Sequence, residues 1–266
     1  MLRYLTNPPN LITLSSMFCG FYAIVLAGSS AGDPESLYRA GLFIILATIF
    51  DALDGRVARM TGTASDFGVQ LDSLSDLVSF GVAPAVVIYQ WGLSSFGFLG
   101  LLASFAFAAA GAMRLARFNI TVSEIPKGFS QGLTITQSAG MMAAALVFNH
   151  RVLDGELKHP ELLLAASLGF AFIMVSDVWF RTFKDLRMNA RGRAFVAVVL
   201  LSMAAIVVTT REFSYILVVY PTLHVVTGIL EDILRYARGK THAQLIEEYQ
   251  LESMQDDEVE EGLVHP

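Results

Sequence analysis

Long runs of apolar residues, separated by short polar segments, extend over most of this chain. Between residues 11 and 234 most runs approach the length that a helix needs to cross the hydrocarbon core of a bilayer, which is roughly 20 residues. The pattern therefore predicts an all-α polytopic membrane protein, a bundle of about eight transmembrane helices. The expected spans are residues 11–27, 38–60, 67–91, 96–113, 132–149, 161–180, 194–209 and 213–234.

Proline and small polar residues mark the boundaries of several spans. Pro8 and Pro9 precede the first run, so we expect its helix to begin at Asn10 or just after. Residues 61–66 (TGTASD) form the expected turn between the second and third spans. The seventh span is short and only a few residues separate it from the eighth, which predicts a tight hairpin for that pair.

The composition agrees with a membrane domain and narrows the classes of function. Of 266 residues, 54% are hydrophobic and 16% charged, and the loops are too short to hold a second domain. We therefore expect one transmembrane domain over residues 1–240 and an acidic, disordered cytoplasmic tail over residues 241–266, which lack Lys and Arg. No basic face for a nucleic acid is evident, and the lone Cys19 excludes an internal disulfide.

Lys and Arg are distributed unevenly between the two ends of the predicted spans. With eight spans both termini share a side, and that side holds most of the 18 basic residues. The basic residues on the terminus side are Arg3, Arg56, Arg59, Arg114, Arg117, Lys127, Arg181, Lys184, Arg187, Arg191, Arg193, Arg235, Arg238 and Lys240. Those on the other side are Arg39, Arg151, Lys158 and Arg211. Since cytoplasmic loops carry the excess of positive charge, we expect a protein of the cell (inner) membrane with both termini in the cytoplasm.

Four aspartates interrupt the apolar pattern at the end of the second span and the start of the third. Asp51 and Asp54 are spaced i, i+3, and Asp72 and Asp76 are spaced i, i+4, so each pair shares a helix face. Two helices facing each other would bring the four carboxylates together. Like charges this close take up protons or cations, and an all-oxygen cluster suits Mg²⁺ or Mn²⁺. Two such ions, about 3.5–4 Å apart, form the usual clamp for phosphoryl chemistry.

Small residues and one arginine accompany the aspartates. Gly55, Ala58 and Gly68 would let a bulky phosphate ester approach the helices. Arg59 offers a forked cation that suits a phosphate. The alternative, that the aspartates are solvated helix ends beside a membrane, does not account for these four residues at these spacings.

The spacing D-x2-D-G-x2-A-R-x8-G-x3-D-x3-D, which runs from Asp51 to Asp76, resembles the signature of the CDP-alcohol phosphotransferases at every position. This resemblance implies an integral membrane enzyme, commonly homodimeric, that moves a phosphatidyl group from a CDP-linked lipid onto an alcohol and releases CMP. It implies that Asp51, Asp54 and Asp72 bind a pair of divalent ions. Asp76 binds metal, deprotonates the alcohol as the catalytic base, or does both.

The resemblance also assigns residues to the CDP-lipid. Some belong to the motif, and Asn10 and Thr13 resemble the short segment that closes over the nucleotide in relatives. The residues expected to line the CDP-lipid site are Asn10, Thr13, Gly55, Ala58, Arg59, Ser65 and Gly68.

Two further stretches resemble the phosphatidylserine synthase branch of the family. They are residues 113–119 (MRLARFN) and 173–186 (IMVSDVWFRTFKDL), so the resemblance covers roughly residues 10–190. It implies CDP-diacylglycerol and L-serine as substrates. Arg114 and Arg117 are spaced i, i+3 at the end of the fourth span, and a pair of arginines would bind the serine carboxylate well. Alternatively, both arginines face lipid phosphates, as cations on the cytoplasmic side do.

The sequence departs from that branch at one place. A Gly-Leu-Pro-x-Pro pattern is often found there, whereas this chain has Thr134 and Thr136 at the two proline positions. Inositol phosphate, glycerol phosphate and choline therefore stay open as acceptor alcohols. A cation-coupled transporter is the alternative from another class, because intramembrane carboxylates are common in transporters, although no inverted repeat is evident. An assay of CMP release would separate the two classes.

Overall fold

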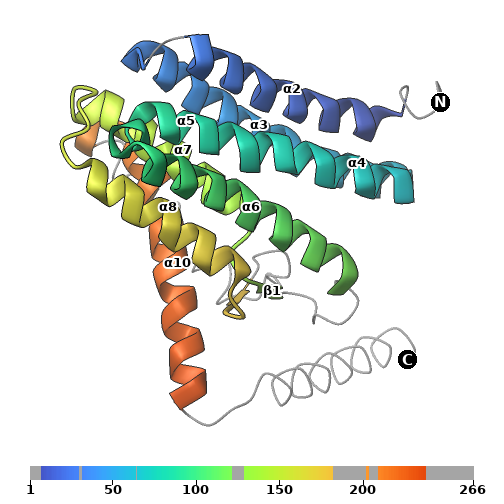
Figure 1. Ribbon diagram of the computed structural model, residues 1–266. Helices are drawn as coiled ribbons and strands as arrows, with labels where there is room; N and C mark the ends of the chain where they lie inside the picture. The colour runs from blue at the N-terminus through green and yellow to red at the C-terminus, as the bar shows by residue number, and fades with distance from the viewer. Residues whose placement is uncertain are drawn as a thin grey trace.

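The structure is a computed structural model that describes residues 7–29, 32–63, 65–121, 129–181, 202–203 and 209–237. These residues are almost entirely helical, which confirms the predicted all-α class (Figure 1). The helices are α2 (Pro8–Ser29), α3 (Pro34–Thr61), α4 (Asp66–Asp76), the π-helical η1 (Leu77–Val82), α5 (Ala83–Trp91), the short η2 (Leu93–Phe96), α6 (Phe98–Thr121), α7 (Ile135–Val152), α8 (Pro160–Val175) and α10 (Ser214–Ala237). Two short strands, β1 (Phe129–Gln131) and β2 (Trp179–Arg181), pair in antiparallel orientation.

Five of the described helical segments are long and apolar enough to cross a membrane. They are Pro8–Ser29, Pro34–Thr61, Asp66–Trp91, Phe98–Thr121 and Ser214–Leu234. The helix Pro160–Val175 is apolar but shorter. Most of the predicted seventh span, residues 194–209, lies outside the described residues, as does the acidic tail, so the total of eight spans stays a prediction. The protein is a polytopic membrane helical bundle.

Several helix ends differ from the sequence prediction, and three of these differences concern α2, α6 and α8. α2 begins at Pro8, two residues before Asn10, because the fixed φ angle of proline suits a first helical turn and no N–H is needed there. α6 continues to Thr121, well beyond the expected end at residue 113, so both arginines predicted to bind the acceptor lie within the helix. α8 ends at Val175 instead of residue 180, and residues 179–181 form β2.

The turn between α3 and α4 brings the two halves of the aspartate motif to the same end of the bundle (Figure 1). Gly62 ends α3 in the left-handed conformation, with φ of 62°, and its N–H donates to the Ala58 carbonyl. Ser65 caps the start of α4, where its hydroxyl oxygen accepts a hydrogen bond from the Gly68 N–H at 3.1 Å. The sequence TGTASD therefore forms the predicted turn.

Small residues allow the helices to approach closely in the interior. α2 packs along α3, and Ala23 and Ala27 on α2, with Ala40 and Ala47 on α3, are completely buried. Close backbone approach of this kind is the usual way in which helices associate within a bilayer. Larger side chains such as Phe80 fill the centre.

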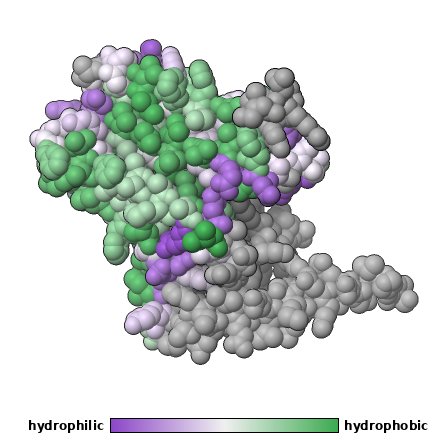
Figure 2. Space-filling model, turned by 45° about the vertical axis from the view of Figure 1, so that its right-hand side comes forward, coloured by the Kyte–Doolittle hydropathy of each residue, from purple (hydrophilic) through white to green (hydrophobic). Residues whose placement is uncertain are grey.

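Large apolar side chains also cover the outside of the bundle. Phe18, Phe98, Phe105 and Phe172 are each more than half exposed in the isolated chain. Figure 2 shows hydrophobic residues over much of the upper part of the face in view, with hydrophilic residues at its margins and in a band across its lower middle. This surface fits contact with lipid, in which an exposed phenylalanine costs nothing.

Candidate active site

Three of the four motif aspartates converge between the C-terminal half of α3 and the C-terminal half of α4. Carboxylate oxygens of Asp51, Asp72 and Asp76 all lie within 4.8 Å of one another, and the three side chains are half-buried. Three negative charges at this separation repel one another unless a cation or protons intervene. Carboxylate oxygens are the ligands that hard divalent cations prefer, so the residues fit a metal site of this kind.

Asp54, the fourth aspartate, is turned toward α2. Its side chain is buried, and its Oδ2 lies 2.7 Å from the Thr13 hydroxyl. The same hydroxyl lies 3.0 Å from the Pro9 carbonyl oxygen, so its single proton is shared between two acceptors. Asp54 remains within electrostatic reach of Asp76. It therefore connects the acidic cluster to the first helix.

A cavity of about 220 Å³ adjoins this cluster. Its walls come from the start of α2, the end of α3, the α3–α4 turn and the start of α4, and they include Asp54 and Asp72. The wall contains every residue that the sequence predicted for the CDP-lipid: Asn10, Thr13, Gly55, Ala58, Arg59, Ser65 and Gly68. The motif lies on α3 and α4 only, and the structure adds residues of α2 to the wall of the same cavity.

The glycines keep this cavity open. A Cβ atom on Gly68 would lie 3.3 Å from Ser65 Oγ and 3.5 Å from Asn10 Oδ1, inside the space between α4 and α2. A Cβ on Gly55 would lie 3.7 Å from a terminal nitrogen of Arg59. The start of α4 also contributes a positive helix end to the same wall, which favours an anion such as a phosphate.

Two serines that the sequence analysis did not single out attach α2 to this site. Ser75 Oγ donates to the Thr13 carbonyl and Ser79 Oγ donates to the Ser16 carbonyl, both at 3.0 Å. Ser16 Oγ in turn donates to the Ala47 carbonyl of α3 at 3.0 Å. The three helices that hold the cavity are therefore bound together by hydroxyl-to-carbonyl hydrogen bonds. The i, i+4 spacing of Ser75 and Ser79 in an apolar helix was the available signal.

Arg114, on α6, lies buried near the acidic cluster. Only 8% of its surface is exposed, and its charge lies close enough to Asp76 to attract that carboxylate. One terminal nitrogen donates to Ser130 Oγ at 3.2 Å, and the guanidinium stacks on the Phe118 ring at 5.3 Å. Its Nε has no hydrogen-bond partner among the described residues. Arg114 thus retains donor capacity beside Asp76.

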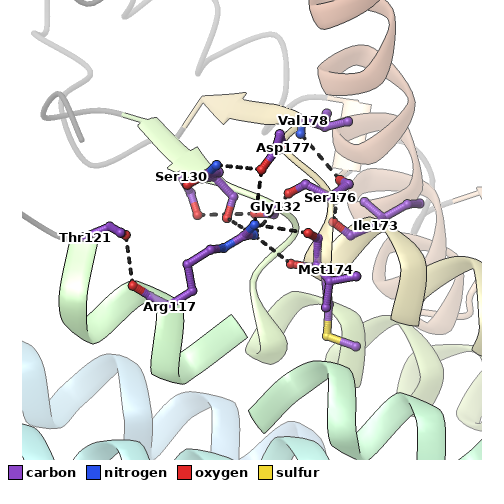
Figure 3. A network of polar contacts seen from close by, with 11 residues as sticks. Arg117, Thr121, Ser130, Gly132, Ile173, Met174, Ser176, Asp177 and Val178 are labelled. Atoms are coloured by element: carbon purple, nitrogen blue, oxygen red, sulfur yellow. Dashed lines mark hydrogen bonds and ion pairs between the residues drawn. The ribbon is translucent and has the colours of Figure 1, made fainter. Parts of the chain in front are cut away.

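Arg117 holds the end of α8 (Figure 3). Its guanidinium reaches from α6 to the last carbonyls of α8, which a helix leaves without internal donors. The acceptors are the carbonyls of Gln131, Met174, Val175 and Ser176 and the carboxylate of Asp177, at 3.0–3.4 Å. Gly132, with φ of 70°, lets β1 pass close to the same carbonyls. These bonds satisfy carbonyls at the end of α8, which lies five residues before the predicted end at residue 180.

The two threonines that replace the expected prolines have a local role at the start of α7. Thr134 is the N-cap of the helix, and its hydroxyl oxygen accepts from the Gln137 N–H at 3.1 Å. Thr136 lies in the first turn of the same helix. The departure from the Gly-Leu-Pro-x-Pro pattern is therefore compatible with an ordered helix start next to Gly132.

Comparisons with known proteins point to one family. A family model described as CDP-alcohol phosphatidyltransferase matches residues 6–230. A Helicobacter pylori protein named CDP-diacylglycerol–serine O-phosphatidyltransferase is 32% identical over 222 residues, which cover 84% of this chain and 89% of the relative. Relatives with the same name are 31% identical in Methanocaldococcus jannaschii, over 90% of this chain and 98% of the relative, and 33% identical in Bacillus subtilis, over 66% and 90%.

Proposed function

This chain belongs to the CDP-alcohol phosphatidyltransferase family, and we propose that it transfers the phosphatidyl group of CDP-diacylglycerol to L-serine with release of CMP. The observation that carries the reaction type is the cavity that joins every predicted CDP-lipid residue to a cluster of carboxylates. The choice of serine is supported by relatives named for that acceptor along most of the chain. Both termini and the acidic cluster would face the cytoplasm of the cell (inner) membrane.

Asp51, Asp54, Asp72 and Asp76 would hold two divalent ions, Mg²⁺ or Mn²⁺. The close approach of three of these carboxylates supports the assignment. Asp54 would join them because it lies within electrostatic reach of Asp76 and lines the cavity. When bound, such ions neutralise the diphosphate and stabilise the negative charge that develops on the leaving CMP.

The walls of the cavity would bind the CDP moiety. Arg59 would donate to a phosphate oxygen, and the start of α4 would offer its N–H groups to the same diphosphate. Gly55, Ala58 and Gly68 leave the space that the diphosphate needs. The polar side chains of Asn10, Thr13 and Ser65 would contact the nucleotide.

Asp76 would act as the general base. The serine hydroxyl oxygen forms a bond to the phosphorus that carries diacylglycerol, and the bond from that phosphorus to the CMP oxygen breaks. The proton of the hydroxyl goes to an oxygen of Asp76. The position of Asp76 supports this role, because it is the last residue of α4 and lies within electrostatic reach of the other aspartates and of Arg114 on α6.

Arg114 is the better candidate of the two arginines for the serine carboxylate. It combines burial, a position within electrostatic reach of Asp76 and an Nε donor with no partner among the residues that the structure describes, whereas the donors of Arg117 are occupied by the end of α8. Arg117 would then contribute by holding β1 and Ser130, the partner of Arg114, in place. Homodimer formation stays a prediction drawn from the family resemblance.

An acceptor screen tests the proposal. Purified protein with CDP-diacylglycerol and Mg²⁺ or Mn²⁺ should release CMP with L-serine and not with glycerol phosphate, inositol phosphate or choline. Ethanolamine, which is serine without its carboxylate, should be a poor acceptor if Arg114 binds that group. CMP release with another alcohol and none with serine would contradict the acceptor, and no CMP release with any alcohol would contradict the reaction.

A further inference from the structure

Asn119, near the end of α6, contacts α4 beside the acidic cluster. Its Nδ2 donates to Ser73 Oγ at 3.0 Å, and the Ser73 hydroxyl donates onward to the Val69 carbonyl, one turn earlier on α4, at 3.1 Å. Asn119 Oδ1 lies 3.4 Å from the same Oγ, farther than the Val69 carbonyl, so it is the weaker acceptor for that proton. Both side chains are half-buried. The pair is therefore a partly shielded hydrogen bond between α4 and α6.

The bond lies close to the groups proposed to act on the acceptor. Ser73 lies between Asp72 and Asp76 on α4, and Asn119 lies five residues beyond Arg114 on α6. At 1.5 Å per residue, the bond is about 4.5 Å along α4 from Asp76 and about 7.5 Å along α6 from Arg114. Asp76 and Arg114 are themselves within electrostatic reach of each other. The two helices are thus connected at two levels, by opposite charges and by a hydrogen bond.

Asp76 lies at a junction between two kinds of packing. α4 packs along α2, whereas α6 packs against η1, which begins directly after Asp76. Among the described residues, α4 and α6 themselves come close at few points. Packing of η1 on α6 therefore holds the chain on one side of Asp76, and the bond between Ser73 and Asn119 holds it on the other side. Without this bond, α4 would be free to move away from α6 just where Asp76 has to face Arg114.

The acceptor makes a demand on this geometry. Two carbon atoms separate the hydroxyl of serine from its carboxylate, so a base and an arginine can engage both groups at once only at a matching separation. We propose that Asn119 is a positioning residue which, through Ser73, holds α4 at a set distance from α6. This distance fixes the separation of Asp76 and Arg114, and it thereby selects an acceptor with the hydroxyl and carboxylate spacing of serine. The inference rests on the proposed transfer to serine.

Homoserine measures this selection, because it is serine with one more methylene between hydroxyl and carboxylate. One methylene is commonly discriminated by about 10–200-fold, so the wild-type protein should prefer serine to homoserine by at least about tenfold in kcat/KM for CMP release. Asn119→Ala should lower kcat/KM for serine about tenfold and reduce the preference over homoserine to about threefold or less, with the apparent KM for CDP-diacylglycerol unchanged. Ile120→Ala is the matched control on α6, because this neighbour is 78% exposed, and it should behave as the wild type does.

A double-mutant cycle shows whether the two residues act through each other. Ser73→Ala should reduce the preference for serine as Asn119→Ala does, and the double variant should be no worse than either single variant. Ser73→Thr keeps the hydroxyl and should retain the preference. Because both acceptors are assayed on the same preparation, a loss of folded protein changes both rates equally and leaves their ratio unchanged.

A cross-link tests the contact itself without turnover. Ser73→Cys and Asn119→Cys are combined in a Cys19→Ala background, which removes the single native cysteine. A short bifunctional thiosulfonate should join the two thiols, as detected by mass spectrometry of the digested protein. The control pair, Ser73→Cys with Ile120→Cys, should stay unjoined under the same conditions.

Three results would overturn the proposal. The first is the same serine-to-homoserine ratio in Asn119→Ala as in Ile120→Ala, because the bond then has no part in selection. The second is additive losses in the cycle of Ser73 and Asn119, because the two residues then act independently. The third is equal cross-linking of the two cysteine pairs. Failure of the proposed function looks different, since the wild-type protein itself would then release no CMP with serine.

Discussion

A methyl group added at Gly20 should disturb the active site although this residue lies outside it. Gly20 is the point where α2 crosses η1, and a Cβ atom there would lie 2.9 Å from the Cβ of Ser79 and closer still to its Cα. Carbon atoms pack best at about 3.5–4.0 Å, so the helices would have to separate by roughly 1 Å. Ser79 is completely buried and the clash includes backbone, so no flexible side chain can give way. Overpacking of this kind costs about 1–3 kcal/mol of stability.

The displacement passes to the catalytic groups through the serine hydrogen bonds. A shift of this size breaks the 3.0 Å bond from Ser79 to Ser16 and strains the 3.0 Å bond from Ser75 to the Thr13 carbonyl. The Thr13 hydroxyl then moves away from Asp54, from which it lies 2.7 Å. Since a misplacement of about 1 Å can cost 10²-fold in rate, we expect CMP release by Gly20→Ala to fall on the order of 10²-fold.

Gly28 provides the control, because it lies on the same helix and a Cβ there would meet nothing within 4 Å. Gly28→Ala should be neutral or slightly stabilising, as alanine is the better helix former. The two variants are compared by thermal inactivation in detergent and by CMP release at saturating substrates. If Gly20→Ala matches Gly28→Ala in both measurements, α2 is not held against η1 as described and the argument fails.

The remaining predictions concern the site itself. Removal of divalent ions with excess chelator should abolish CMP release, and added Mg²⁺ or Mn²⁺ should restore it; full turnover in chelator would refute the metal assignment. Arg59→Lys keeps the charge but loses the forked guanidinium, so in steady-state kinetics the apparent KM for CDP-diacylglycerol should rise more than the apparent KM for serine. Asp76→Asn should lower turnover by roughly 10²–10⁴ while CDP-diacylglycerol still binds, whereas near-normal turnover would exclude a base at this position. Arg114→Lys should raise the apparent KM for serine at an unchanged melting temperature. Arg117→Lys should instead lower the melting temperature, because several α8 carbonyls lose their donors. Identical behaviour of the two variants would show that both arginines share one role.

The fold class and most residues that line the cavity beside the acidic cluster could be predicted because their signals are local. Apolar runs define the helices whatever their partners, since a bilayer requires each span to satisfy its own backbone. The motif from Asp51 to Asp76 spans two helix ends joined by one short turn, so its spacing largely determines which residues face each other. Asn10 and Thr13 came from the family resemblance, and the cavity contains both.

The attachment of α2 to the site could not be predicted in this way. Ser75 and Ser79 donate to the backbone carbonyls of Thr13 and Ser16, which are far away in the sequence. Every residue has a backbone carbonyl, so the sequence does not show which one accepts a hydrogen bond. A serine in a membrane helix is equally typical of simple close packing. Gly20 has the same ambiguity, because the sequence does not say which backbone approaches it.

The two arginines of α6 show how the same local pattern leads to different roles. Their i, i+3 spacing at a helix end suggested one carboxylate site for both. In the structure α6 continues to Thr121, and the end of α8 lies against its last turns. Arg117 then donates to a row of carbonyls at the end of α8, while Arg114 lies within electrostatic reach of Asp76 and its Nε has no hydrogen-bond partner in the described part of the chain. Arg117 thus secures the end of α8 and the strand that carries Ser130, the hydrogen-bond partner of Arg114, so one arginine would hold in place the surroundings in which the other would bind serine.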